Sequence, residues 1–354
     1  MKRILTALCA ALLLTACSTQ ESQKPTEQST GAPFSSAAQT QPADSYDPFA
    51  LPEDAAQGRA MPSFSHGVVG QDGANLVFAY APTVTFPYEL RNDSAKNDFG
   101  LLLFVNGFRQ PYRTDDDPAE DILHVFDVDA GETALRQITF APVAGEPGET
   151  LSVQIVLMID PRFTPTAQTK DGEWFITHSL RPLCPAVMTV TDPTGATAPA
   201  VCTEYDTEEI TDALRHKYDR MSATGGYSGE NDLDRMLFAE LLKNDVLVTP
   251  ADRAAGNADQ TPFTASDSIT VCLYGGGAPC TYRVSLYCDH GLVSGAFDGA
   301  DYVDMTPSRD VICKRVIDPS LLPGGSYVYV IAVPLQGGKT MYPEKSRTVF
   351  LSEK

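Results

Sequence analysis

From about residue 62 onward, the sequence carries its apolar residues in short runs that Gly, Pro, Asn and Asp interrupt. The clearest run is Leu101 to Val105, which Asn106 and Gly107 separate from the segment 108–112. An Asn-Gly pair adopts positive φ at both positions at low cost, and the tight turn that results has the twist that antiparallel strands need. This segment therefore predicts a β-hairpin, and the runs around it predict a mainly β fold.

Several later segments alternate apolar and polar residues with the period of a strand. The segment 151–159 places an apolar residue at every odd position, which predicts one buried face. The segments 269–273 and 280–288 alternate on either side of a Gly-rich loop, and we expect both apolar sets to share one face because a one-residue slip would turn one set outward. Further strands are expected at 310–317, 327–333 and 348–351.

Between these β segments the periodicity becomes helical. Asp206, with Glu209 three places on, is typical of a capping box, and apolar residues follow at helical spacing from Ile210 to Met221. Gly225 and Gly226 interrupt this pattern, and a second helix is expected over 230–244. We expect both helices to pack against a sandwich and to bridge the two β units. The alternative is an exposed helical hairpin that grips a partner.

Two turns with related sequences each lead into a late strand. They are Pro147-Gly148-Glu149-Thr150 and Pro323-Gly324-Gly325-Ser326. A Pro-Gly turn in this place resembles the second half of many bacterial immunoglobulin-like sandwiches. The resemblance implies two β-sandwich-like (Ig-like) domains and carries no function with it.

The N-terminus begins with Lys2 and Arg3, followed by an apolar stretch that is too short to span a bilayer. The next residues, Leu14-Thr15-Ala16-Cys17, resemble the lipobox of bacterial lipoproteins. The resemblance implies cleavage between Ala16 and Cys17 and a diacylglycerol group on the Cys17 thiol. It also implies a protein anchored to the cell membrane on its extracytoplasmic side. The alternative is an ordinary secretory signal with a chance cysteine.

The expected organisation therefore begins with a signal peptide over 1–16 and a tether over 17–61. Two β-sandwich-like domains follow, over 62–203 and 263–354, and a helical connecting segment over 204–262 joins them. The tether is rich in Ser, Thr, Gln and Pro, so we expect it to be disordered. The formal net charge of −20 argues against nucleic acid as a partner, since phosphate binding needs clustered Lys and Arg. The expected partners are the membrane, through the lipid, and an unknown envelope or extracellular ligand, either protein or glycan.

Outside the signal peptide and the lipid site, six cysteines remain in the chain. Pro185 to Val201 is expected to form a hairpin around Asp192-Pro193-Thr194-Gly195, because Pro presets the first corner of such a turn and Gly closes it. Cys184 and Cys202 flank this hairpin, so we predict a disulfide between them. A zinc site would combine Cys272, Cys280, Cys288 and His290, but only Cys288 and His290 are closely spaced and the register turns Cys272 to the other face, so no zinc site is predicted. Cys313 is the sixth cysteine.

No metal or cofactor is predicted. The acidic run from Asp115 to Asp121 is typical of a solvated loop. Structural calcium bound by its carboxylates is the alternative, although no helix–loop–helix ligand pattern accompanies it.

No common catalytic motif occurs in the sequence. The five histidines lie far apart, and none is next to a serine or cysteine in a recognisable nucleophile context. We therefore expect no catalytic residues and interpret the chain as a non-catalytic binding or structural module at the cell envelope. The alternative is a hydrolase of an envelope polymer, glycan or peptide, whose site is too dispersed for a motif to reveal.

Overall fold

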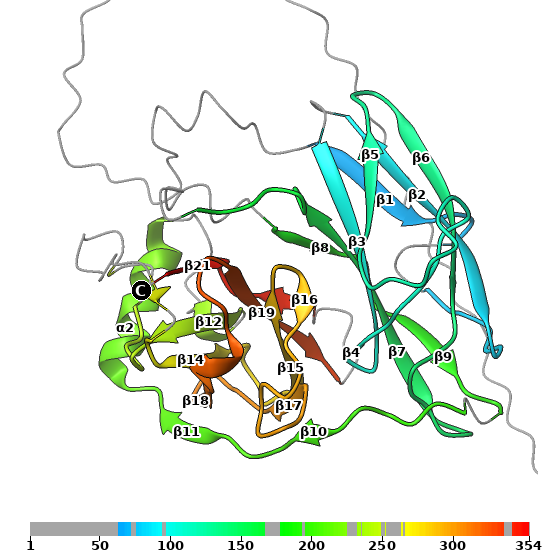
Figure 1. Cartoon of the computed structure of the whole chain (residues 1–354). Coiled ribbons are helices and arrows are strands. Elements are labelled where there is room, and N and C mark those ends of the chain that lie inside the picture. The colour runs from blue at the N-terminus through cyan, green and yellow to red at the C-terminus, as the bar shows by residue number, and fades with distance from the viewer. Residues whose placement is uncertain are drawn as a thin grey trace, which may run out of the picture. The chain divides into compact units, whose positions relative to one another are not determined.

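The structure is a computed structural model that describes residues 63–71, 76–93, 97–166, 178–192, 195–224, 232–234, 236–248, 252, 263–264, 266–335 and 342–353. These residues are mainly in β-strands, and α2 (Asp212–Thr224) is the α-helix among them. The strands form two Ig-like β-sandwiches, which confirms the predicted fold class (Figure 1). The predicted signal peptide and tether lie outside the described residues.

The first sandwich packs a three-stranded sheet against a six-stranded sheet. The smaller sheet has the order β1 (Phe64–Val68), β2 (Val84–Asn92) and β6 (Thr133–Phe140). The larger sheet has the order β4 (Phe108–Arg109), β3 (Asn97–Val105), β7 (Thr150–Ile159) and β8 (Leu180–Pro182), with β5 (His124–Val128) paired to β3 and β9 (Ala186–Thr189) paired to β7. Apolar side chains of both sheets fill one core, including Phe86, Tyr88, Leu101, Leu103, Ile155 and Leu157.

The hairpin predicted at Asn106-Gly107 is confirmed. β3 and β4 pair antiparallel with Val105 opposite Phe108, and φ is 48° at Asn106 and 75° at Gly107. The Asn106 side chain also joins the turn to β7, because its Oδ1 accepts a hydrogen bond from the Ser152 N–H at 2.8 Å. The turn is therefore fixed by its own backbone preference and by a side-chain contact to the neighbouring strand.

The second sandwich packs an eight-stranded sheet against a four-stranded sheet. The larger sheet has the order β10 (Val201–Cys202), β17 (Tyr302–Met305), β15 (Tyr282–Cys288), β19 (Tyr327–Pro334), β21 (Val349–Ser352) and β13 (Phe263–Thr264), with β16 (Gly291–Leu292) on β15 and β20 (Glu344–Lys345) on β19. The smaller sheet has the order β11 (Asp206–Glu209), β18 (Val311–Ile317), β14 (Ile269–Gly275) and β12 (Leu237–Lys243). The three later strands predicted from the sequence correspond to β18, β19 and β21.

The alternating segments on either side of the Gly-rich loop are β14 and β15. Their apolar sets do meet in one core, which contains Ile269, Val271, Leu273, Tyr282, Val284 and Leu286. The two strands lie in opposite sheets, however, so the loop crosses from one sheet to the other and does not close a hairpin. Cys272 faces away from this core, as the register predicted, and belongs to the cluster under α2.

The hairpin predicted over 185–201 is wrong. β9 pairs with β7 in the first sandwich, whereas β10 pairs in parallel with β17 in the second. The segment between them carries the chain from one sandwich to the other, so the second sandwich begins at Val201. The turn chemistry around Gly195 is a local signal, and such a signal does not determine which strands pair.

The helical prediction is correct for one helix and wrong for the other. α2 begins after Thr211, whose Oγ1 accepts a hydrogen bond from the Leu214 N–H at 3.2 Å. The predicted capping box is instead strand β11. The second predicted helix is also wrong, because β12 pairs with β14 along its whole length and is preceded by the short 3₁₀ helix η1 (Asp232–Asp234). A short apolar run is compatible with both the helical and the strand period. Here the run forms a strand because it pairs with β14.

Helix α2 covers the outer face of the four-stranded sheet and does not bridge the sandwiches. Leu214 and Tyr218 of the helix pack on Leu242, Cys272 and Tyr274 of the sheet. The Tyr218 and Tyr274 hydroxyl oxygens lie 2.6 Å apart.

The two sandwiches belong to one compact unit, Tyr46–Lys354, and meet through the outer faces of their larger sheets. We call this contact the seam and define it by its buried side chains: Leu102, Phe104, Val156, Met158, Tyr287, Tyr327, Tyr329, Ile331 and Val333. Burial on both faces explains why β7 and β19 are nearly continuous apolar runs. The sequence predicted only the face of β7 that enters the first core.

The hairpin turn of the first sandwich also contacts the second sandwich. The Arg283 guanidinium lies 3.9 Å from the centre of the Phe108 ring and donates a hydrogen bond from Nη1 to the Asn106 carbonyl at 2.9 Å. Its Nε and Nη2 donate to the two carboxylate oxygens of Asp304 at 2.9 Å and 2.8 Å. Arg283 therefore connects the turn to the body of the second sandwich through a cation–π contact and hydrogen bonds.

Candidate functional site

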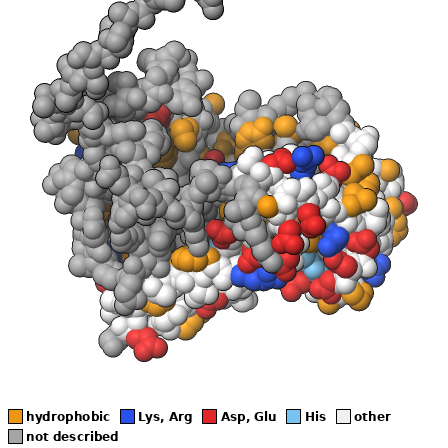
Figure 2. Space-filling model, turned by 90° about the horizontal axis from the view of Figure 1, so that it is seen from above, with side chains coloured by type: hydrophobic (Ala, Val, Ile, Leu, Met, Phe, Trp, Pro, Cys, Tyr) orange, Lys and Arg blue, Asp and Glu red, His pale blue; other side chains and the backbone are white. Residues whose placement is uncertain are grey.

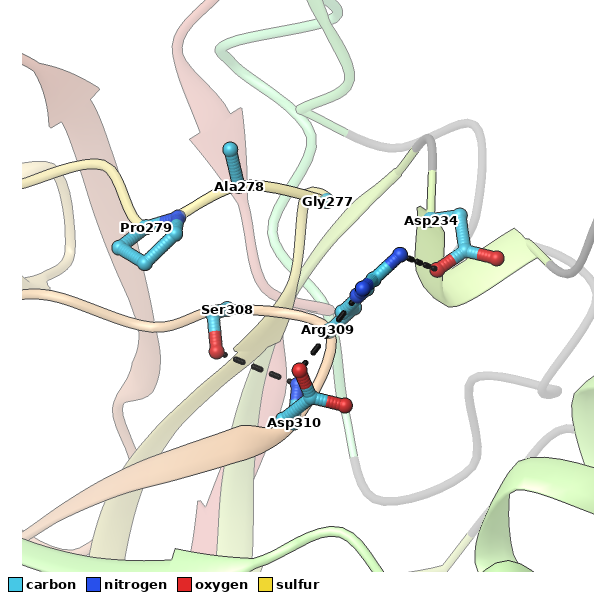
Figure 3. Close-up of a pocket in the computed structure, with 7 residues that line it drawn as sticks. All are labelled: Asp234, Gly277, Ala278, Pro279, Ser308, Arg309 and Asp310. Carbon is cyan, nitrogen blue, oxygen red and sulfur yellow. Dashed lines mark hydrogen bonds and ion pairs between the residues drawn. The ribbon is translucent and has the colours of Figure 1, made fainter.

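A pocket lies where η1 meets two connections of the second sandwich, the one from β14 to β15 and the one from β17 to β18. Its volume is about 460 Å³, which is in the range of small-ligand sites. The residues that line it are Asp234, Gly277, Ala278, Pro279, Ser308, Arg309 and Asp310 (Figure 3).

Three consecutive glycines shape one wall of this pocket. Gly275, Gly276 and Gly277 have φ values of 82°, 80° and 73°, a region that other residues rarely adopt. The Gly276 N–H donates to the Met236 carbonyl at 2.8 Å. A Cβ at position 275 would lie 2.4 Å from the Met236 carbonyl oxygen, and one at position 277 would lie 2.6 Å from that of Asp234. Glycine is therefore required at positions 275 and 277 for the loop to approach the backbone of Met236 and of Asp234 in η1 this closely.

The charged groups of the pocket surround Arg309. Its Nη1 lies 3.9 Å from Asp234 Oδ1, and its Nε lies 3.4 Å from Asp310 Oδ2. Asp310 Oδ1 also accepts a hydrogen bond from Arg215 of α2 at 2.7 Å. The Arg309 side chain is 58% exposed, so these ion pairs are weak and the guanidinium can bind a ligand. Asp234 Oδ1 is buried and accepts no hydrogen bond from the described residues.

The chemistry of the described lining suits binding. It offers one guanidinium, two carboxylates and the Ser308 hydroxyl, and it contains no imidazole, thiol or amine. Ser308 Oγ accepts a hydrogen bond from the Asp310 N–H at 3.2 Å. A guanidinium recognises a carboxylate or phosphate, and the Asp234 and Asp310 carboxylates can accept hydrogen bonds from a ligand.

None of the described histidines lines this pocket. His66 is hydrogen-bonded to the Tyr88 hydroxyl at 3.0 Å, and burial lowers the pKa of His66 to about 4. His124 contacts the Tyr112 carbonyl through Nε2 at 2.8 Å, and His216 is exposed on α2. His178 and His290, far apart in the sequence, meet at the seam with 4.5 Å between ring centroids.

The predicted Cys184–Cys202 disulfide is absent from the described residues, in which both cysteines are free. The prediction depended on the hairpin over 185–201, and without that hairpin its geometric basis is lost. Cys184 Sγ lies 3.7 Å from the Tyr342 hydroxyl, and Cys202 Sγ lies 3.6 Å from the Glu204 carbonyl. Cys272, Cys280, Cys288 and Cys313 are free as well. Burial raises the pKa of Cys313 to about 11, so its thiol is protonated at neutral pH.

The carboxylates of the acidic run bind neighbouring protein groups. Asp115 Oδ1 accepts a hydrogen bond from the Gln137 N–H at 3.0 Å. Asp116 lies 2.7 Å from Arg136 in an ion pair, and Asp117 accepts from the Ala119 N–H at 3.1 Å. Across the described residues, no group of three or more His, Cys, Asp or Glu side chains is arranged to hold a metal ion.

A few large apolar side chains are exposed on the described surface. Figure 2 shows acidic and basic side chains interspersed over the described part of one face, with apolar side chains scattered among them. Val77 and Val187, exposed by 60% and 42%, are partners in an isolated bridge. Two valines cover far less area than a typical protein-binding patch.

The predicted lipidation and cleavage sites, Ala16 and Cys17, lie outside the described residues. Within the part of the chain that the structure describes, no helix has the length and apolar character needed to cross a bilayer.

Sequence reasoning missed the pocket and the seam histidines. The signal that the sequence offers for the pocket is the Gly-Gly-Gly-Ala-Pro segment, which predicts a loop. Nothing in the sequence connects that segment with Arg309 or Asp234. A pocket could be predicted from the three glycines only if β14 and β15 were known to lie in different sheets.

The fold and the pocket together define a tandem Ig-like β-sandwich protein with a polar pocket. No family profile and no curated protein matches its sequence. Among solved structures, the chain is similar to a CARDB domain from Pyrococcus furiosus, at 9% identity and a TM-score of 0.22 over 37% of this chain and 96% of that one.

It is also similar to the structure of a Salmonella enterica SafA pilin in complex with the SafB chaperone, at 7% identity and a TM-score of 0.24, covering 82% of this chain and 98% of that one. A Porphyromonas gingivalis protein of unknown function gives 9% identity and a TM-score of 0.23, covering 81% and 99%. Similarities at this level carry no functional inference.

Proposed function

We propose that this chain is a lipid-anchored extracytoplasmic protein whose two joined sandwiches act as a rigid, non-catalytic binding or structural module at the cell envelope. The seam between the two sandwiches is the observation that supports a rigid module. The location comes from the resemblance of residues 14–17 to a lipobox.

The seam supports a rigid pair because its contacts are of the kind found in a protein core. Phe108 of the first sandwich and Tyr302 of the second meet edge to face with 5.1 Å between ring centroids, and the side chains that define the seam are all less than a tenth exposed. Arg283 adds hydrogen bonds at the rim. Interfaces between domains that move are smaller and more polar. A tandem joined in this way would hold the loops at its ends at a fixed spacing.

The pocket around Arg309 supports binding as the activity. Its guanidinium and the carboxylates beside it would recognise a polar ligand that presents both an acidic group and a hydrogen-bond donor. A protein chain or a glycan of the envelope can supply such groups, so the identity of the ligand stays open between these two classes.

The anchor is tested by labelling cells that express the full chain with a radioactive fatty acid. The variant Cys17→Ala should lose all label, because the thiol is the acceptor. Cys9→Ala is the matched control, since Cys9 lies in the signal region and should leave labelling unchanged. Normal labelling of Cys17→Ala would contradict the proposal.

The activity is tested by capture from envelope fractions with the full chain, comparing the wild type with Arg309→Ala. The control is Arg91→Ala, which removes another exposed arginine that is ion-paired to an aspartate, at 2.6 Å. A ligand of the pocket should be lost from Arg309→Ala and retained by the control. Breakdown of an envelope polymer that persists through further purification would refute the non-catalytic reading and favour the hydrolase.

A further inference from the structure

Two histidines that belong to different sandwiches face each other at the seam. His178 precedes β8 of the first sandwich and is fully buried, and His290 lies in the turn between β15 and β16 of the second. Their rings are 4.5 Å apart at an interplanar angle of 72°. Both residues have positive φ, 57° and 65°, which is uncommon for histidine. The surrounding contacts must therefore hold the backbone in this conformation at both residues.

Neutral histidines complete the hydrogen bonds of both rings. His178 Nε2 lies 2.9 Å from the Phe163 carbonyl, and His290 Nε2 lies 2.6 Å from the Pro161 carbonyl. A carbonyl oxygen can only accept, so each Nε2 carries a hydrogen. In a neutral ring Nδ1 is then an acceptor, and hydroxyl groups face it: Thr348 at 3.3 Å from His178 and Tyr329 at 2.7 Å from His290. The closed seam therefore satisfies two neutral imidazoles.

The charged groups around the histidine pair are mostly positive. The half-buried Lys345 donates to Thr348 Oγ1 at 2.8 Å, the same hydroxyl that faces His178. Arg109 donates from Nη2 to the His290 carbonyl at 2.9 Å. Among the described residues, the carboxylate that acts on His290 is Asp289, and its Oδ1 already accepts a hydrogen bond from a seam N–H at 3.1 Å.

The remaining titratable neighbours are tyrosines. The Tyr327 ring lies 5.1 Å from His178 and 5.2 Å from His290, and Tyr329 lies 6.1 Å and 5.7 Å from the same rings. Burial raises the pKa of both tyrosines, so they stay neutral. Burial also lowers the pKa of Lys345 to about 7, so this amine gains its own proton over the same pH range. A proton added to either imidazole would then join the charges of Arg109 and Lys345 and face one carboxylate, in a region with little water to screen it.

We propose that the seam is an acid-sensitive contact, in which protonation of His178 and His290 opens the interface between the sandwiches while each sandwich keeps its own core. This inference concerns the described residues alone and does not depend on the lipid anchor or on a ligand for the pocket.

The direction of the response follows from the linkage between proton binding and opening. Burial, followed by the charges of His290 and Lys345, lowers the pKa of His178 to about 2. Burial is also the main cause that lowers the pKa of His290 to about 4. An opened seam would return both to about 6.5. The contribution of the two histidines to the closed state is therefore fully present above pH 6.5 and is lost as the pH falls below it. Between pH 7.5 and pH 5, each histidine would raise the opening constant by about 30-fold, and the two together by up to about 1,000-fold.

Three buried methionines provide a readout that separates seam opening from unfolding. Met158 belongs to the seam, Met188 to the core of the first sandwich and Met305 to the core of the second. All three are fully buried. Oxidation by hydrogen peroxide requires access to the sulfur, so the oxidation rate of each methionine, followed by mass spectrometry, reports exposure of its own region.

The experiment measures these three rates in the full chain at pH 7.5 and pH 5. We expect oxidation of Met158 to accelerate at least tenfold at pH 5 while Met188 and Met305 stay protected. The double variant His178→Gln/His290→Gln should abolish the acceleration, and Lys345→Gln should shift it to lower pH because one seam cation is removed. His66→Gln is the control, since His66 also has a lowered pKa but lies within the first sandwich.

Protection of Met188 and Met305 at pH 7.5 confirms that each variant is folded. Three results would overturn the proposal: a Met158 that stays protected at pH 5 in the wild type, three methionines that become reactive together, or acceleration that survives in a folded double variant. If the double variant does not fold, the oxidation rates of the three methionines in the wild type at pH 5 test the proposal by themselves.

Discussion

Replacing Gly107 by alanine tests the contact between the hairpin turn and the second sandwich. A Cβ at this position would lie 2.7 Å from Arg283 Cβ and 2.9 Å from Leu335 Cδ2. Positive φ costs an alanine roughly 1–2 kcal/mol, and φ here is 75°. Inserting a methyl group into a packed contact costs about 1–3 kcal/mol more. Gly107→Ala should therefore lower the free energy of unfolding by about 2–5 kcal/mol.

Gly131→Ala is the matched control for this substitution. Gly131 has nearly the same φ, 79°, but nothing lies within 4 Å of a Cβ built there, so only the backbone cost applies. Urea denaturation of both variants gives the two free energies of unfolding. Their difference, expected at about 1–3 kcal/mol, isolates the contact with Arg283 and Leu335. Equal destabilisation by the two substitutions would refute the close approach of the turn to the second sandwich.

Three further substitutions test single interactions by the free energy of unfolding. Thr211→Ala should cost about 1 kcal/mol because it removes the cap of α2, while Thr211→Ser should cost little; equal effects would contradict the cap. Tyr112→Phe should cost about 1–3 kcal/mol, because the buried Tyr112 hydroxyl donates to the Leu101 carbonyl at 2.6 Å; a neutral effect would show that this carbonyl is satisfied otherwise. His66→Gln should flatten the loss of stability as the pH falls from 6.5 towards 4, since the pKa of His66 is lowered in the folded state; an unchanged pH profile would rule out this contribution.

The sequence predicted those strands whose signals are local. The turn at Asn106-Gly107 has one strongly preferred geometry, and the flanking residues pair as that geometry requires. The odd-numbered residues of 151–159 do enter one core. In both cases the backbone preference and the burial pattern favour the same structure, so no knowledge of the distant chain was needed.

The predictions from sequence are wrong where a segment is compatible with two local structures. In these cases a strand distant in the sequence determines which structure forms. The residues of β12 have the spacing of an amphipathic helix, but pairing with β14 places Leu237 and Leu241 in the sandwich core and turns Phe238 towards α2. Similarly, a good turn sequence near Gly195 did not make a hairpin, because β9 completes the sheet of β7. Non-local pairing of this kind is invisible to periodicity.

The candidate site could not be predicted for the same reason. The groups at the pocket come from η1 and two separate connections of the second sandwich, and the two seam histidines come from different sandwiches. Each residue is unremarkable in its own sequence context. Only the assembled fold places Arg309 beside Asp234, or His178 beside His290.

The acid response of the seam sets two electrostatic effects against each other. The chain has a formal net charge of −20, so acid also neutralises surface carboxylates and reduces repulsion between the sandwiches, which favours closure. Those carboxylates act through solvent, where salt screens charges over about 8 Å at physiological ionic strength. The two histidine rings are 4.5 Å apart, with His178 buried and His290 partly buried, so salt screens a charge on them less than it screens a surface charge. The local effect should therefore dominate, and raising the salt concentration should leave the acid-driven oxidation of Met158 nearly unchanged. A response that salt abolishes would assign the opening to surface charge and not to His178 and His290.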